Sequence, residues 1–192
     1  MTPSLGGAAA VALSVMLSAH AETVTPAQIA YDTNVSEDPA AKACMLGLAV
    51  NDHAVGETVR FRLVVARVKR DAVLAGPAVF GFTIEVDDPR LALARRSQTH
   101  AAQISSAAFA SERYTVAARP RTTPFADGSW VASTLDVAEG GALVDAAVEG
   151  KFQIAYTRTR PSAARIYQVA SAPPLDVLGR FSGCIGGLQL AE

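Results

Sequence analysis

Apolar and polar residues alternate along several stretches of this chain, which is the pattern of a β-strand with one buried face. The clearest case is 78–88, where Phe80, Phe82 and Ile84 alternate with small or polar residues. Similar patterns and short apolar runs predict strands over residues 43–50, 58–70, 113–119, 129–138, 151–159 and 164–170. The chain is therefore predicted to be rich in β-structure.

The stretch 58–70 changes phase part-way along. Its apolar phase ends at Val65, and Arg67 and Lys69 then occupy the positions that would face the core. An extra residue in a strand moves all the following side chains to the other face of the sheet. We therefore predict a β-bulge near Val64 or Val65.

Two segments have helical rather than strand spacing. In 140–151 apolar residues recur four positions apart, and Gly150 can supply the left-handed residue that ends a helix. Leu178, Phe181 and Ile185 have the spacing of a second short helix near the end of the chain.

The stretch 88–111 has a weak apolar stripe and several serines, and we interpret it as a partly irregular excursion. The predicted elements are six or seven short strands and two short helices. Such a set favours a mostly β fold, an antiparallel β-sandwich or a partly closed barrel with two short helices.

The N-terminus has the pattern of a secretory signal peptide over residues 1–21. An unbroken run of apolar and small residues at 5–17 is shorter than the roughly 20 residues that span a bilayer. Ala19 and Ala21 occupy the −3 and −1 places of a small-x-small cleavage site. The mature protein is therefore expected to be periplasmic or secreted.

The rest of the chain divides into two parts. Residues 22–42 are polar and have no sustained period, and we interpret them as an extended leader. Residues 43–192 show no internal repeat and no linker, and their length suits a single β-rich domain.

Charge and hydropathy exclude two classes of partner. Lys and Arg number 17 and Asp and Glu number 18, so the formal net charge is −1. This balance gives no electrostatic reason to bind nucleic acid or an acidic membrane surface. No second long apolar run occurs, so we predict no membrane span in the mature protein.

The chain has two cysteines, Cys44 and Cys184. A metal site would need further ligands at close spacing, and a redox site would need Cys-x-x-Cys. In an oxidising compartment the pair is expected to form one disulfide, with two free buried thiols as the alternative. Gly183, Gly186 and Gly187 are expected to let the backbone turn tightly around Cys184.

Two acidic clusters are candidates for metal-binding or catalytic chemistry. Asp52, His53 and Glu57 could hold a metal ion, although their surroundings are typical of a turn. The strand end at Glu85–Asp88 could supply an acid and a base, but acidic residues also commonly follow a strand. The chain has no Gly-x-Ser-x-Gly motif, and we predict no catalytic residue, metal or cofactor.

A candidate ligand site rests on three arginines and the one tryptophan. Arg158 and Arg160 share one face of a strand end, with Arg165 close by, and could bind a carboxylate or phosphate. Trp130 could be a stacking platform for a ligand. The alternatives are a solvated sheet face for the arginines and packing against 88–111 for the tryptophan.

The order of several segments resembles the invasion-associated locus B type of small exported proteobacterial protein. The order is an early cysteine, the strand FTIEVDD, then WVASTLDV, the helix-to-strand unit GALVDAAVEGKFQIAY and a final FSGC. The resemblance implies a β-rich envelope protein without known catalysis, and it transfers no site residues.

These observations predict an exported, non-catalytic module that binds a protein partner or a small ligand in the cell envelope. One alternative is a metal-dependent enzyme or metal-binding protein that uses Asp52, His53 and Glu57 or the 85–88 strand end. Another alternative is a structural subunit of the envelope, which would form stable oligomers.

Overall fold

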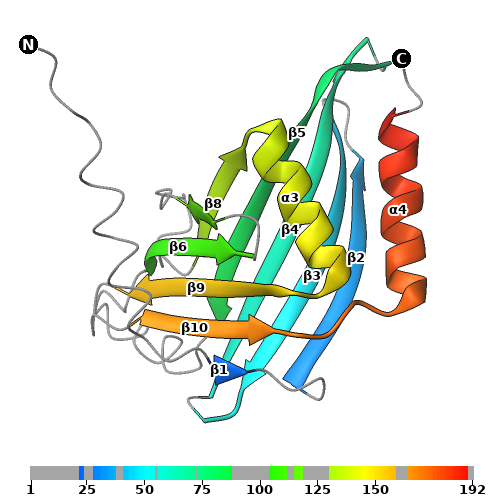
Figure 1. The fold of residues 1–192 in the computed structure, drawn as a ribbon. Coiled ribbons are helices and arrows are strands. Elements are labelled where there is room, and N and C mark those ends of the chain that lie inside the picture. Colours follow the sequence, from blue (N-terminus) through cyan, green and yellow to red (C-terminus); the bar gives the residue numbers. More distant parts are fainter. Residues whose placement is uncertain are drawn as a thin grey trace, which may run out of the picture.

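Two five-stranded sheets and two helices make up the described part of the chain (Figure 1). The computed structural model describes residues 22–23, 28–37, 41–54, 56–71, 73–87, 104–111, 115–118, 130–158 and 164–189. The predicted signal peptide lies outside these residues. The two sheets do not close into a barrel. The predicted β-sandwich is therefore confirmed, and the alternative of a partly closed barrel is wrong.

Sheet B is antiparallel throughout and has the order β2-β3-β4-β5-β8. Its strands are β2 (Ile29–Glu37), β3 (Ala41–Asp52), β4 (Glu57–Arg70), β5 (Val73–Asp87) and β8 (Trp130–Leu135). Two short hairpins join the three long central strands directly. Apolar residues alternate inward along most of β3 and β4 and along the second half of β5.

Sheet A has the order β1-β10-β9-β6-β7 and is antiparallel except for the β1–β10 pair. Its strands are β1 (Glu22–Thr23), β6 (Ile104–Ala110), β7 (Thr115–Ala118), β9 (Phe152–Arg158) and β10 (Ala164–Val169). Strands β9 and β10 cross the long strands of sheet B, and sheet A covers only one end of them (Figure 1). Helices α3 (Val137–Glu149) and α4 (Leu175–Gln189) cover the other end.

Phe61 lies at the centre of the core between the two sheets. Its ring centroid is 5.8 Å from that of Phe82 on the same sheet, and 5.9 Å and 5.6 Å from those of Phe109 and Phe152 on sheet A. All four side chains are at most 2% exposed. Burial of such aromatic rings is the main force that holds the sheets together.

Helix α3 confirms the helical period predicted for 140–151 and begins slightly earlier. Asp136 caps its N-terminus, because the Asp136 side chain accepts from the Glu139 backbone and the Glu139 side chain accepts from the Asp136 backbone. Gly150 ends the helix in the left-handed region, at φ 66°. Gly140 lets α3 approach β5, because a Cβ there would lie 2.2 Å from the Phe80 ring.

Three strands were not predicted, and one of them is the two-residue strand β1 at the start of the predicted leader. Strand β6 lies within the stretch 88–111, which was interpreted as irregular; its alanines and serines pack in sheet A although they give a weak sequence signal. Within the predicted leader at 22–42, residues 29–37 are the edge strand β2 and pair with β3 along their whole length.

The phase change in β4 has a different cause from the one predicted. The register through Val64 and Val65 is regular, so the bulge predicted there is wrong. The irregularity lies beyond Ala66, where residues 76–78 of β5 stand opposite Arg67 alone. Arg67 therefore stays on the inner face of sheet B.

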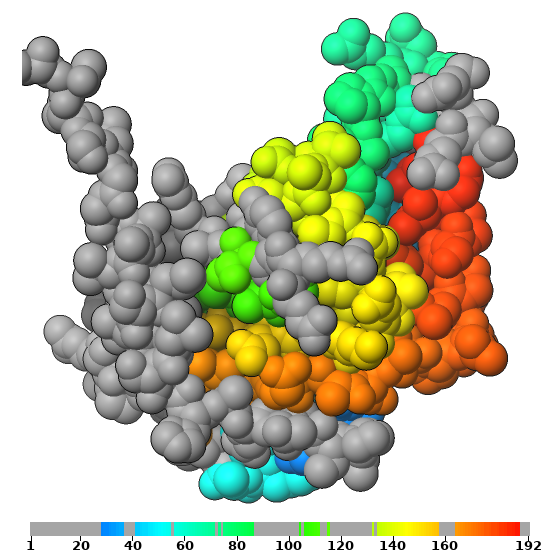
Figure 2. All heavy atoms as spheres, viewed as in Figure 1, coloured from blue at the N-terminus to red at the C-terminus, as the bar shows by residue number. Residues whose placement is uncertain are grey.

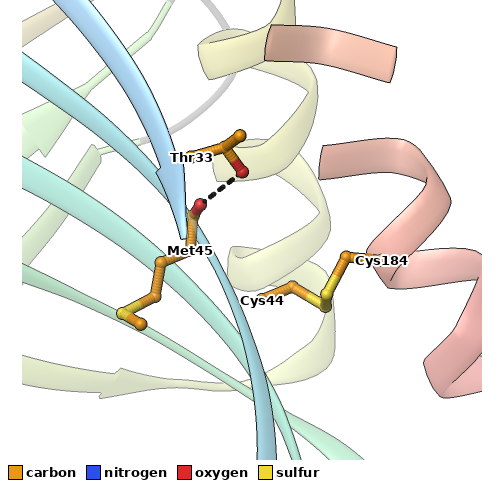
Figure 3. The surroundings of a disulfide bond; sticks show 4 residues. All are labelled: Thr33, Cys44, Met45 and Cys184. Atoms are coloured by element: carbon orange, nitrogen blue, oxygen red, sulfur yellow. Dashed lines mark hydrogen bonds between the residues drawn. A yellow bond between two sulfur atoms is a disulfide. The ribbon is translucent and has the colours of Figure 1, made fainter. Parts of the chain in front are cut away.

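The disulfide is confirmed. Cys44 on β3 and Cys184 on α4 are bonded, with 5.8 Å between their Cα atoms, and no free cysteine is left (Figure 3). The backbone around Cys184 is different from the one predicted. Gly183, Gly186 and Gly187 do not form a tight turn but lie inside α4, which runs on to Gln189.

The disulfide should contribute strongly to stability, since it closes a loop of 140 residues and so restricts the unfolded chain. Replacing both Cys44 and Cys184 by alanine should lower the free energy of unfolding by about 2–4 kcal/mol, measured by urea unfolding. A reducing agent should lower the melting temperature of the parent but not of the double variant. Free Cys44 and Cys184 thiols in a non-reduced digest would contradict the assignment.

Gly150→Ala should destabilise the protein by more than about 1 kcal/mol. The new Cβ would lie 2.1 Å from the backbone oxygen of Ser171, and φ is positive. Gly179→Ala is the matched control, since Gly179 is inside α4 with open space around its Cβ position. Thermal unfolding should show a loss for the first variant and none for the second.

Candidate functional site

A groove lies between α3 and α4, over the end of sheet B that sheet A leaves uncovered (Figure 2). Its volume is about 330 Å³, within the range of small-molecule sites. Most of the described lining residues are apolar, and one cation and one carboxylate are among them. The lining residues are Val65, Arg67, Gly76, Pro77, Ala78, Phe80, Gly141, Val144, Asp145, Ile185 and Leu188.

The irregular β4–β5 pairing shapes the floor of this groove. Residues 76–78 bulge out of the ladder opposite Arg67, and Gly76 takes a positive φ of 71°. Such bulges bend a strand and change the direction of its side chains. Here Pro77 and Ala78 line the groove, and the hairpin end projects beyond the helices (Figure 1).

Arg67 holds the groove together at one end. Its Nε donates to the Gly76 carbonyl oxygen at 3.0 Å, and its Nη1 donates to the Leu188 carbonyl oxygen at 2.5 Å. The first bond secures the bulge, and the second reaches the last turn of α4. Carbonyl groups in the last turn of a helix lack partners within the helix and carry its negative partial charge, so a cation there is favourable.

A second cation stands beside Arg67. Lys42 is its direct cross-strand partner on β3, and Lys42 Nζ lies 3.8 Å from the position that a Cβ on Gly187 would occupy. Like charges directly opposite each other on a sheet are destabilising unless something compensates them, and Glu37 on β2 is the other direct cross-strand neighbour of Lys42. Helix α4 has no basic residue in its own last turn, so these two strand residues supply the positive charge at its C-terminus.

The acidic candidates Asp52 and Glu57 form a second site, at the opposite end of β3 and β4. They are direct cross-strand neighbours, and their exposed fractions are 1% and 6%. Tyr167 donates to Asp52 Oδ2 at 2.9 Å, and Tyr156 donates to Glu57 Oε2 at 2.6 Å. Both tyrosines belong to sheet A, so the two bonds join the sheets.

The third member of this predicted cluster does not join it. His53 is exposed in the turn, whereas Asp52 and Glu57 are buried, and Asp52 Oδ1 also accepts from the Ala54 backbone at 3.0 Å. Within the described ranges, no group of three or more His, Cys, Asp or Glu residues is placed to hold a metal ion. The described geometry makes Asp52 and Glu57 part of the sheet-to-sheet contact.

Burial raises the pKa of the Tyr167 phenol far above its usual range, and the neighbouring Tyr156 and the hydrogen bond to Asp52 raise it further. Burial also raises the pKa of Tyr31 to about 12. Tyr31 donates to the Ser171 carbonyl oxygen in the segment that leads into α4. Both phenols therefore stay protonated and keep donating at neutral pH.

The acidic strand end at Glu85–Asp88 lies only partly within the described residues, and its catalytic role stays a hypothesis. Glu85 lies on the outer face of sheet B, 3.1 Å from Arg62 Nη1 and 3.9 Å from Arg60 Nη1. Asp87 is the last residue of β5, and Asp88 lies outside the described residues.

The candidate ligand site of Arg158, Arg160, Arg165 and Trp130 lies only partly within the described residues, and it stays a prediction. Arg165 is half-buried on β10, and Arg158 is the last residue of β9, both in sheet A. Trp130 begins β8 in sheet B, opposite Glu85. Arg160 lies outside the described residues.

The groove residue Arg67 was not among the predicted site residues, although the sequence carried a signal for it. Its place in the apolar phase of β4 was interpreted as evidence for a bulge, not for a cation on the inner face. The other walls of the groove gave no signal, because Gly76, Gly141 and Ile185 come from segments far apart in the chain.

Comparisons with protein-family models, with curated proteins and with solved structures find no match for this chain. Neither of the helices in the described residues is long and apolar enough to cross a membrane.

The free energy of unfolding should fall as the pH rises above about 10. There the unfolded chain releases a phenolic proton that Tyr167 retains in the folded protein, so ionisation favours the unfolded state. Tyr167→Phe should make this fall shallower. It should also cost about 1–3 kcal/mol at neutral pH, since Asp52 loses a hydroxyl donor. Urea unfolding across a pH series measures both effects, and an unchanged alkaline slope would contradict this account.

Proposed function

We propose that this protein is an exported, non-catalytic binding module of the cell envelope, and that its ligand occupies the groove between α3 and α4. The observation that carries the proposal is the groove itself. A concave site of about 330 Å³ with mostly apolar walls and few polar groups is the usual form of a small-molecule site.

The chemistry of the lining supports binding rather than catalysis. Nucleophilic catalysis needs a serine, cysteine, threonine or lysine nucleophile with an activating group beside it. None of these residue types, and no histidine, is among the described residues that line the groove. Its charged groups, Arg67 and Asp145, can orient a ligand through hydrogen bonds and charge.

Two sequence features support export. The pattern of residues 1–21 predicts a signal peptide, and the Cys44–Cys184 disulfide is of the kind that persists in oxidising compartments such as the periplasm. The resemblance in segment order to invasion-associated locus B proteins also favours an envelope protein.

A substitution that fills the groove should abolish binding. Gly141 lies on the α3 wall, and a Cβ there would meet open space, so Gly141→Leu should occupy the groove without a backbone clash. Titration with an uncharged, polarity-sensitive dye such as Nile red should show binding to the parent protein and none to this variant. Thermal unfolding checks that the variant is folded. Leucine favours a helix more than glycine does, so the substitution should leave α3 intact.

Gly179→Leu is the matched control. It also places leucine at a helical glycine with open space around it, but Gly179 is exposed on α4 and does not line the groove. This variant should bind the dye as the parent does. If Gly141→Leu binds the dye as tightly as Gly179→Leu, the groove is not the binding site.

A further inference from the structure

We propose that the ligand of the groove is an aliphatic carboxylate, with its chain on the apolar walls and its head group on the Arg67 guanidinium. The inference rests on the proposed function, and it commits that function to one class of ligand.

The first argument is an excess of positive charge at one end of the groove. Arg67 and Lys42 are direct neighbours across β3 and β4, on the inner face of the sheet. None of the ion pairs between described residues involves either of them. Glu37 on β2 is the other direct neighbour of Lys42, whereas the irregular β5 segment opposite Arg67 carries no charge, so the uncompensated charge is that of Arg67 and an anion in the adjoining groove would be attracted to it.

The second argument is the number of donors that Arg67 has. A guanidinium carries five N–H donors in a planar fork. One donor on Nε and one on Nη1 are used, toward the Gly76 and Leu188 carbonyl oxygens. These two bonds fix the plane of the guanidinium, and the remaining donors have no partner among the described residues. A fork already held in place can bind a carboxylate with little loss of side-chain entropy.

The third argument selects the head group. Asp145 on α3 lines the same groove and adds a negative charge to its wall. A phosphate monoester would bring a second negative charge into the groove, where the described lining has one cation, Arg67, and one carboxylate, Asp145. That second charge would lose its hydration without gaining a partner. A single negative charge therefore suits the groove best.

The fourth argument selects the rest of the ligand. Away from Arg67 and Asp145 the walls are aliphatic or aromatic, including Phe80, Val144 and Ile185. An unbranched hydrocarbon chain would gain free energy there by leaving water and would leave no polar group unpaired. The groove volume of about 330 Å³ favours a chain of medium length.

The test compares ligands that differ in one part only, on the full oxidised chain. Decanoate has the chain and the charge, decanol has the chain alone, and acetate has the charge alone. Isothermal calorimetry, supported by displacement of Nile red, should show decanoate binding at least about tenfold more tightly than decanol, and no acetate binding. Added salt should weaken decanoate binding and leave decanol binding unchanged.

The variants identify the cation. Because Arg67 also secures the bulge and the end of α4, the diagnostic quantity is the ratio of the decanoate affinity to the decanol affinity, which Arg67→Gln should lower about tenfold. Arg60→Gln is the matched control, because Arg60 lies on the same strand but on the outer face. Asp145→Asn should strengthen decanoate binding, since it removes a like charge from the wall.

The outcomes separate this inference from the proposed function. If decanol binds as tightly as decanoate, or if Arg67→Gln leaves the ratio of the two affinities unchanged, the carboxylate assignment is overturned and the groove remains a site for apolar ligands. If Gly141→Leu does not impair the binding of any of these probes, the proposed function fails as well. The comparison of decanoate with decanol needs no substitution, so it decides the head group even if Arg67→Gln does not fold.

Discussion

The position of α4 depends on one covalent bond, the disulfide between Cys184 and Cys44. The helix follows β10 after a short extended segment and lies along β2 and β3, at the end of sheet B that sheet A does not reach (Figure 1). Many of its residues are glycine or polar, so its apolar contact with the sheet is limited to a few side chains such as Phe181 and Leu188. The disulfide compensates for this weak contact. Together with the buried side chains of Val177, Phe181 and Leu188, it fixes the second wall of the groove.

Two cations of sheet B, Lys42 and Arg67, also act on the position of α4. The last turn of α4 has no basic residue of its own, and Lys42 and Arg67 on the sheet supply the missing charge. Two adjacent cations repel each other on an ordinary strand pair. Here Glu37 is the other cross-strand neighbour of Lys42, and the Leu188 carbonyl oxygen at the end of α4 accepts from Arg67. Arg67 keeps N–H donors that are directed to neither the Gly76 nor the Leu188 carbonyl oxygen. The residue that secures α4 can therefore also bind an anion.

The contacts that join the two sheets and the candidate binding groove lie at opposite ends of sheet B. At one end, the Phe61 cluster and the bonds from Tyr156 and Tyr167 to Glu57 and Asp52 join the two sheets. At the other end, where the sheet is covered by helices, the β4–β5 ladder is irregular and the surface is hollow. Irregular backbone at the edge of a well-packed core is common at binding sites, because the core holds the site in shape.

The sequence alone determined the features that depend on local period and on composition. Alternating apolar and polar residues predicted most of the strands, and apolar residues four positions apart predicted α3. The presence of two cysteines predicted the disulfide. The sequence did not reveal β6, whose alanines and serines give little contrast between the two faces of a strand. The groove was decided by tertiary structure, since β4, β5, α3 and α4 each contribute a wall. Arg67 shows the physical reason: a cation on the inner face of a strand is unfavourable by local rules, and it becomes favourable only where a helix from more than a hundred residues away ends above it.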